Sequence, residues 1–312
     1  AVDCLRGFCL SSGLGDVYTR RAIQRGFAST LCWSPLGFSM IISVSVVPGA
    51  SWSAAALPGL VSALMMLVIG WGLDALYKPQ VKPNTRPLET ERWVTQLRPL
   101  LVLLGLVLVG VALLHSVAGV EVIGAVMSLV PLIAILWIAM QQPPVGLTRS
   151  VNVRQRALLF VTRELPNYRG EIVLLFMAGF IGSLGAFLLV PLVQAQALDL
   201  TTIPPWIIVA AMVWIIPVTG QLGMNPILAV SLLVPILPSP EVMGIPPTAM
   251  VVAITGGWAL SGATSPFTAS VMLAASLGGV SPLRAGLGWN GVYILAAGAA
   301  LTLWALSLFY IL

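Results

Sequence analysis

The stretch TGGWALSGATSPFTASVMLAASLGGVSP, residues 255–282, has two apolar half-segments that flank a polar, helix-breaking centre, SGATSP at 261–266. An unpaired backbone group in the hydrocarbon of a membrane costs several kcal/mol, so an ordinary membrane helix does not contain such a centre. Helices that are interrupted in this way are found where the interruption lines a cavity, and their free ends then bind ligands. The stretch therefore predicts a discontinuous membrane helix at about 246–280.

The same pattern occurs a second time, near the start of the chain. The segment SPLGFS at 34–39 aligns with SPFTAS at 265–270, and both continue through an apolar half-segment into a turn rich in Gly, Pro and Ser. A long apolar segment follows each turn. Two interrupted helices at corresponding places in two halves of a chain are the best indication in a sequence of a transporter's binding site.

The composition is that of an integral membrane protein. Of the 312 residues, 58% are apolar and 8% are charged. About 20 consecutive apolar residues can span a bilayer, and several such runs are present, whereas no polar block is long enough for a soluble domain. The net charge of +5 comes from basic loops beside the spans, so membrane lipids are expected partners and nucleic acid is not. The three cysteines form no CxxC pair and indicate neither a disulfide framework nor a metal site.

The chain is predicted to consist of two halves joined by a basic linker. Residues 1–77 hold the first interrupted helix and the span after it, residues 78–98 form the linker, and residues 99–312 form the second half. The second half is expected to contain three spans, a hairpin at 203–237, the interrupted helix at 246–280 and a final span. The spans are placed at about 99–117, 119–140, 171–195 and 284–312.

The hairpin at 203–237 is predicted from the length of its two apolar arms. The segment PVTGQLGMNP at 217–226 separates arms of roughly 11 to 13 residues, whereas about 20 residues are needed to cross a bilayer. Two short arms around a tip rich in Gly, Asn and Pro indicate a re-entrant hairpin whose tip reaches the middle of the membrane.

The distribution of charge supports this topology, because basic loops face the cytoplasm. With a re-entrant hairpin, Arg284 falls on the same side as every basic cluster and Glu241 falls on the opposite side. A full span in place of the hairpin would put Arg284 outside and Glu241 inside, so the hairpin fits the charges better. The expected location is the inner (plasma) membrane of a bacterium. The basic clusters lie at 20–25, 78–98 and 149–169.

With these features the chain resembles the ion transporter superfamily, which includes divalent-anion/sodium symporters and the arsenite and sodium/proton antiporter-like families. Its members have two inverted repeats, each with a re-entrant hairpin followed by a discontinuous helix. In this sequence TGQLGMNP at 219–226 stands at the position of a hairpin tip, and TSPFT at 264–268 stands at the helix break. The Ser-Asn-Thr motif and the Thr-Pro-Pro-Asn-like motif of the family are absent, so dicarboxylate specificity does not carry over.

The resemblance implies an all-α integral membrane protein: an inverted-repeat secondary transporter with discontinuous helices and a re-entrant hairpin. It covers nearly the whole chain, but the first repeat has no counterpart of the hairpin and scaffold spans in residues 1–20. A family member that lacks its N-terminal third is therefore expected. The resemblance also implies a homodimer formed through the scaffold spans.

Polar residues at the tip and at the two breaks are the predicted binding residues. The N-terminus of a half-helix carries free N–H groups and about half a positive charge, which suits an anionic group, whereas carbonyl, amide and hydroxyl oxygens suit sodium. We therefore expect a small anion or carboxylate as substrate, Na⁺ as the coupling ion at Asn225 and Thr264, and no other cofactor or metal. The predicted site residues are Thr219, Gly223 and Asn225 at the tip, Thr264, Ser265 and Thr268 at the second break, and Ser29, Thr30 and Ser34 at the first break.

Charged residues are expected only near the ends of spans. Arg20, Arg21 and Arg25 precede the first interrupted helix, and Asp74 lies near the cytoplasmic end of its helix, where its side chain reaches water. Ionisable residues inside a membrane mark proton relays by default, so their absence from the middle of the predicted spans argues against proton coupling through these spans. Sodium coupling, and proton coupling through residues of the expected missing part, are both left open.

The sequence is open to four other interpretations. Small polar residues also permit close helix packing without any ligand. An enzyme is not expected, because the sequence has no HExxH motif, no intramembrane aspartate pair and no phosphate-binding loop, and the single histidine, His115, is placed at an outer helix end. A channel needs a continuous polar path, whereas here the polar centres lie at one depth. A membrane scaffold or partial subunit that does not transport remains the main alternative.

Overall fold

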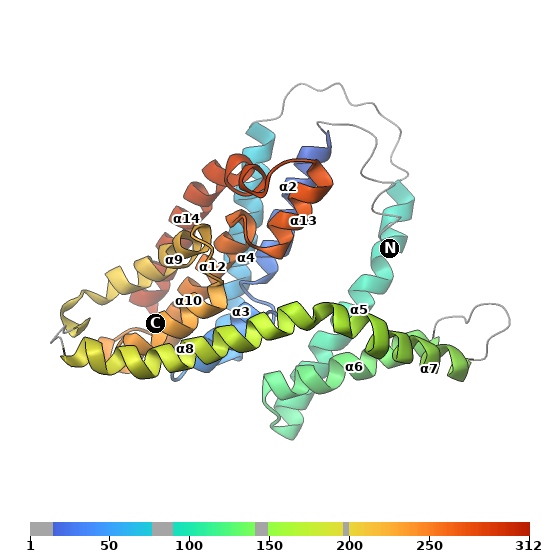
Figure 1. The fold of residues 1–312 in the computed structure, drawn as a ribbon, viewed down its shortest axis with the longest axis horizontal. Coiled ribbons are helices and arrows are strands. Elements are labelled where there is room, and N and C mark those ends of the chain that lie inside the picture. The colour runs from blue at the N-terminus through green and yellow to red at the C-terminus, as the bar shows by residue number, and fades with distance from the viewer. Residues whose placement is uncertain (1–14, 77–89, 141–148, 196–199) are drawn as a thin grey trace. The chain divides into compact units, whose positions relative to one another are not determined.

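The computed structural model describes residues 15–76, 90–140, 149–195 and 200–312, and every element in these ranges is helical (Figure 1). The expected all-α class is therefore confirmed. Residues 78–89 of the predicted linker at 78–98 lie outside the described residues. Three described helices are long and apolar enough to cross a membrane, which agrees with the expected membrane protein. They are α4 (Trp52–Leu76), Leu101–Ala118 within α5, and Arg284–Ile311.

The chain divides into two compact units. The first unit contains residues 1–81 together with 177–312, and the second contains residues 82–176. Both interrupted helices and the predicted hairpin fall in the first unit. All nine predicted site residues therefore belong to one unit.

The second unit is built around a pair of helices, α5 (Thr90–Ala118) and α6 (Val122–Met140), joined by a turn in which Gly119 has a φ of +64°. Val107 and Val111 of α5 pack against buried residues of α6. The helix α7 (Arg149–Leu159) lies in the basic segment 149–169. A π-helical turn (Phe160–Glu164) and a 3-10 turn (Leu165–Tyr168) lead into α8 (Arg169–Ala195), which ends in the first unit.

Both predicted interruptions are present as breaks between helices. The helix α2 ends at Thr30 and α3 begins at Phe38, while α12 ends at Thr264 and α13 begins at Ala269. In the alignment of SPLGFS with SPFTAS, the first residue of α3 is aligned with the first residue of α13. A long helix follows each pair, so the two halves share one order of elements. The bounds are α2 (Gly15–Thr30), α3 (Phe38–Val46), α4 (Trp52–Leu76), α12 (Pro247–Thr264), α13 (Ala269–Gly278), a π-helical turn (Arg284–Gly288) and α14 (Trp289–Ile311).

The two interrupted helices run in opposite directions. Helix α2 packs against α13, and α3 packs against α12, so the first part of each lies beside the second part of the other (Figure 1). Helices α4 and α14 are also antiparallel neighbours, because Trp304 Nε1 donates to Pro58 O at 3.1 Å while Gly70 lies beside the ring of Tyr293. Helices α2 and α3 are thus antiparallel to α13 and α12, as α4 is to α14.

Helix α12 is the central helix of the first unit. Every residue from Ala249 to Thr264 is buried, and the helix contacts α2, α3, α4, α9 and α14. Glycine makes a close contact with α9 possible: a Cβ on Gly257 would lie 2.7 Å from Met212 O and 2.9 Å from Val213 O. Small residues at such points let helix backbones approach each other in membrane proteins.

The predicted hairpin corresponds to α9 (Pro205–Gln221) and α10 (Pro226–Leu233), joined by a turn at residues 222–225 in which Gly223 has a φ of +90°. The first arm is longer than expected, because α9 continues through Pro217 for another turn. A proline is tolerated inside a membrane helix when neighbouring groups satisfy the freed carbonyl. Short elements follow the second arm: a 3-10 turn (Val234–Ile236) and α11 (Pro240–Met243). A further 3-10 turn (Leu200–Thr202) precedes α9.

Replacing Gly257 with alanine should destabilise the first unit, because the new Cβ lies too close to two carbonyl oxygens of α9 and the backbones must separate. The expected loss in the free energy of unfolding is about 1–3 kcal/mol, as for other overpacked positions. The matched control is Gly72→Ala in α4, where a Cβ meets nothing within 4 Å. Thermal unfolding of both variants in detergent tests this, and equal midpoints would contradict the close approach of α12 to α9.

Candidate functional site

The hairpin tip and the second break meet in one polar region. Ser265 Oγ donates to Gly220 O at 2.7 Å, and Gln221 Nε2 donates to Thr264 Oγ1 at 3.2 Å. At the tip itself, a Cβ on Gly223 would lie 3.6 Å from the ring of Phe267, which belongs to the break. We call this region the tip–break site. It joins the end of α9 to the end of α12.

A glycine at position 220 makes this approach possible. A Cβ on Gly220 would collide with the Ser261 hydroxyl, and it would also lie 3.5 Å from Ser265 Cβ. Only a residue without a side chain therefore lets the end of α9 pack against the end of α12. Gly220 was absent from the residues singled out in the sequence, although it belongs to the quoted tip segment.

The remaining predicted residues at the tip and second break serve the backbone around them. Thr219 Oγ1 donates to Ile216 O at 3.0 Å within α9. Asn225 caps α10, since its Oδ1 accepts from Ile227 N at 2.9 Å. Thr268 Oγ1 donates to Ser265 O at 2.9 Å and lies 3.3 Å from Gly262 O. These contacts hold the break and the tip in shape.

The three residues predicted at the first break do not join the tip–break site through hydrogen bonds in the described part of the chain. Ser29 and Thr30 donate to carbonyl groups one turn earlier in α2, at 2.8 and 2.7 Å. Ser34 Oγ accepts from Leu36 N at 3.3 Å. The side chain that reaches the second break is Leu31, whose Cδ1 would lie 3.1 Å from a Cβ on Gly262.

Two buried oxygens of the tip–break site have no hydrogen-bond partner among the described residues. They are Ser261 Oγ and Gln221 Oε1, and Ser261 is fully buried. An unsatisfied buried polar group costs about 1–3 kcal/mol, so these two oxygens are positions at which the described contacts leave the site incompletely satisfied. The described residues contain no cluster of three His, Cys, Asp or Glu side chains that could hold a metal ion. The donor set here is therefore neutral oxygen, which suits a hard cation.

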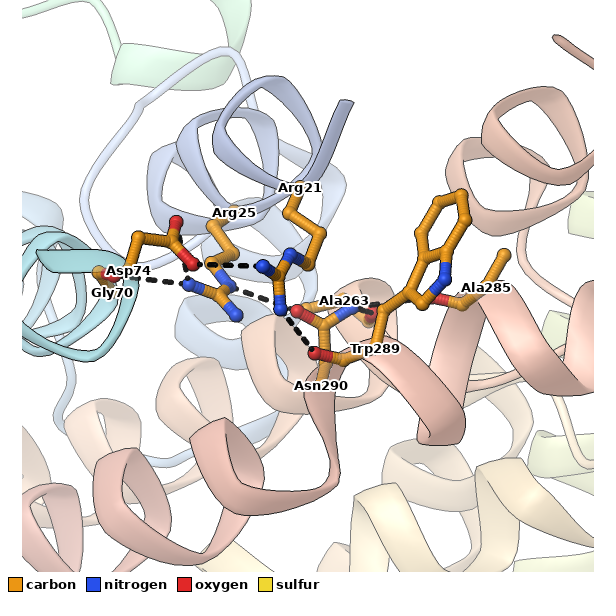
Figure 2. A network of polar contacts seen from close by, with 8 residues as sticks. All are labelled: Arg21, Arg25, Gly70, Asp74, Ala263, Ala285, Trp289 and Asn290. Carbon is orange, nitrogen blue, oxygen red and sulfur yellow. Dashed lines mark hydrogen bonds and ion pairs between the residues drawn. The ribbon is translucent and has the colours of Figure 1, made fainter. Parts of the chain in front are cut away.

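A second polar region, which the sequence analysis did not assign, lies on the other side of the end of α12. Gln24 Nε2 donates to Ala263 O at 2.8 Å, and Asn290 Nδ2 lies 3.3 Å from the same oxygen. Arg25 Nε donates to Asn290 Oδ1 at 2.8 Å (Figure 2). Residues of α2 and α14 thus converge on one carbonyl group of α12.

Arg25 is the centre of this second region. Its side chain is 4% exposed, and its Nη1 donates to Gly70 O at 3.0 Å and to Asp74 Oδ2 at 3.1 Å (Figure 2). The guanidinium carbon lies 4.5 Å from the centre of the Tyr293 ring, which is a cation–π contact. A planar guanidinium with fixed donors suits such a buried, many-partner position.

Arg21 adds a second cation to the same carboxylate. Its Nη2 lies 3.4 Å from Asp74 Oδ1, and its Nη1 donates to Trp289 O at 3.4 Å (Figure 2). We call Arg21, Arg25, Asp74 and Asn290 the arginine cluster. It links α2 and α4 of the first half to α14 of the second.

A cavity of about 440 Å³ adjoins the arginine cluster. Its polar lining includes the two guanidinium groups, the Asp74 carboxylate and Tyr293, and its apolar lining includes Trp289 and Leu295. The lining carries two positive groups and one negative group. Both positive groups contact the Asp74 carboxylate.

The sequence placed these charged residues differently. The arginines were expected before the first helix, but α2 begins at Gly15 and contains them. Asp74 was expected to reach water, but its side chain is 19% exposed and paired with two arginines. The spacing of Arg21, Gln24 and Arg25 puts them on one face of a helix, and this spacing was the sign that could have revealed the region.

Searches against protein-family models, curated proteins and solved structures found no match to this chain. The function proposed below therefore rests on the residues and contacts of the tip–break site and the arginine cluster.

Replacing Asp74 with asparagine should destabilise the first unit, because the buried Arg25 guanidinium loses its charged partner. The expected loss lies between the roughly 1 kcal/mol of an exposed ion pair and the roughly 3–5 kcal/mol of a buried one. Glu241→Gln is the control, since Glu241 is exposed. Thermal unfolding measures both variants, and an Asp74→Asn loss no larger than that of Glu241→Gln would contradict the dependence of Arg25 on Asp74.

Proposed function

We propose that this protein is a secondary active transporter that moves a small anion or carboxylate with a coupling ion. The observation that carries the proposal is the inverted pair of interrupted helices, with a hairpin tip packed on the second break. Paired discontinuous helices are the structural feature by which such transporters hold substrate and ion near the middle of the membrane.

The positions of the charged residues agree with this proposal. Arg20 lies in the first part of the first interrupted helix, beside Gly278 at the end of the second. A Cβ on Gly278 would lie 2.8 Å from Arg20 Nη1. At the opposite end, a Cβ on Gly49 would lie 3.4 Å from Pro247 Cγ, at the start of α12. The end of the first unit that contains Arg20 and Gly278 is thus basic. Basic residues of membrane proteins lie on the cytoplasmic side, so this end would face the cytoplasm.

In the proposed mechanism the tip–break site holds the coupling ion. Two neutral oxygens that have no hydrogen-bond partner among the described residues, Ser261 Oγ and Gln221 Oε1, lie there, together with the hydroxyl groups of Thr264 and Ser265. Na⁺ is the ion that this donor set suits, and the anionic substrate binds beside it, near the free ends of the half-helices. Access then alternates as one bundle moves against a scaffold.

A membrane scaffold that does not transport is the second candidate, and one observation favours it. The side chains of Thr219, Asn225 and Thr268 are all engaged with nearby backbone groups, as they would be if their only task were to support the break. A flux measurement separates the two candidates, because a scaffold moves no substrate.

Thr264→Val and Ser265→Ala should each lower transport at least tenfold, because both remove a hydroxyl oxygen from the tip–break site while nearly keeping its volume. The assay is sodium-driven uptake of radiolabelled lactate, succinate and citrate into proteoliposomes of the full chain. Ser276→Ala is the matched control, since Ser276 is exposed and bonds only within its own helix.

Thermal unfolding must show that these variants fold. Wild-type uptake by folded Thr264→Val and Ser265→Ala would remove the site, and no uptake of any of the three acids by the wild-type protein would favour the scaffold. Asn225→Ala is less informative, because the loss of a helix cap alone costs about 1 kcal/mol.

A further inference from the structure

We infer that Gln24 and Asn290 are positioning residues for the tip–break site, and that they set its affinity for the coupling ion through the carbonyl group of Ala263. In this role they act through the backbone and are not ligands of the ion. The inference rests on the proposed function, because it assigns a task to side chains around the proposed ion site. The two residues come from different halves of the first unit, Gln24 from α2 and Asn290 from α14.

The carbonyl group of Ala263 is held by two buried amides. Gln24 Nε2 donates to Ala263 O at 2.8 Å, and Asn290 Nδ2 lies 3.3 Å from the same oxygen. Gln24 is 3% exposed and Asn290 is fully buried, so water does not compete for these contacts. Helix α12 ends one residue later, at Thr264, and the carbonyl groups of a last turn lack donors within the helix. The two amides supply donors at this point.

The position of Ala263 O fixes the start of the break. The peptide unit that joins Ala263 to Thr264 is planar, so an anchored carbonyl oxygen also anchors the nitrogen and the Cα of Thr264. Thr264 Oγ1 accepts from Gln221 Nε2 at 3.2 Å. The next residue, Ser265, donates to Gly220 O at 2.7 Å. The hydroxyl groups of the proposed ion site thus lie on the two residues that follow the anchored carbonyl.

The π-helical turn Arg284–Gly288 lies against the next carbonyl group of α12. A Cβ on Gly286, within this turn, would collide with Thr264 O, so the turn and the end of α12 are in direct contact. Asn290 Nδ2 also donates to Ala285 O of the turn, at 3.2 Å. One asparagine amide therefore ties the turn to the end of α12. Single π-helical turns within α-helices are frequent at functional sites.

Arg25 sets the orientation of the Asn290 amide. Its Nε donates to Asn290 Oδ1 at 2.8 Å (Figure 2), so the amide oxygen faces the guanidinium group and the amide nitrogen faces Ala263 O. Rotation of the amide would break a hydrogen bond to a charged group, which is stronger than a bond between neutral groups. The arginine cluster therefore has a defined task in this proposal, which is to keep the donor of Asn290 directed at the end of α12.

Gln24→Met and Asn290→Asp test the proposal, because each removes a donor to the anchored carbonyl and nearly keeps the volume of the side chain. Gln24 Oε1 has no hydrogen-bond partner among the described residues, so Gln24→Met sacrifices no further described bond. Asn290→Asp keeps an oxygen for Arg25 Nε. Trp304→Phe is the matched control: it removes another bond from a side chain to a carbonyl group of the opposite half, from Trp304 Nε1 to Pro58 O at 3.1 Å.

The full chain is purified in detergent, and its thermal unfolding is followed while NaCl replaces choline chloride at constant ionic strength. A bound ion stabilises the folded protein according to its affinity, so the dependence of the midpoint on sodium concentration gives the Kd for Na⁺. Gln24→Met and Asn290→Asp should each raise this Kd about three- to tenfold, which is the range that one hydrogen bond supplies. Trp304→Phe should lower the midpoint in choline chloride and keep the wild-type Kd.

A purely structural role of the two amides gives a different result. Lower midpoints with a wild-type Kd in both Gln24→Met and Asn290→Asp would overturn the inference and leave the proposed ion site in place. A Kd raised equally in Trp304→Phe would also overturn it, because any loss of stability would then suffice. If NaCl stabilises the wild-type protein no more than choline chloride does, the sodium site itself is absent, and the inference falls together with the coupling ion of the proposed function.

Discussion

Helix α12 ends at Thr264 among buried residues, so the carbonyl groups of its last turn need hydrogen-bond donors from elsewhere in the chain. Gly262 O accepts from Ser270 Oγ at 2.8 Å, and Ala263 O accepts from Gln24 Nε2 at 2.8 Å. One donor comes from the segment after the break, and the other comes from the opposite half of the chain. Donors from both halves of the chain therefore satisfy the end of the interrupted helix.

The same end of α12 supports both polar regions of the first unit. On one side the end of α9 packs closely enough for Ser265 to donate to Gly220 O, because position 220 has no side chain. On the other side Asn290 joins Ala263 O to Arg25. A movement at the break that displaced Ala263 would therefore disturb the arginine cluster, which gives a physical route between the two regions.

Buried charge is costly in a protein of this composition, and the arginine cluster shows how the cost is met. Arg25 has a carboxylate, an amide oxygen, a backbone carbonyl and an aromatic ring as neighbours. Ionisable groups within a membrane protein are expensive to bury and mark functional positions by default. The cluster and the tip–break site both contact the end of α12.

The sequence by itself determined the all-helical class, the apolar helices long enough to cross a membrane, both helix breaks and the turn between α9 and α10. These features are local: Pro, Gly and Ser interrupt an apolar run wherever they occur, and the length of the run follows directly. It also placed Thr264 and Ser265 at a break. Only the tertiary structure brought Arg25 to Asp74 and Asn290, and Gly220 to Ser265, because those partners lie far apart in the chain. Their contacts depend on the opposite directions of two halves, which no local pattern specifies.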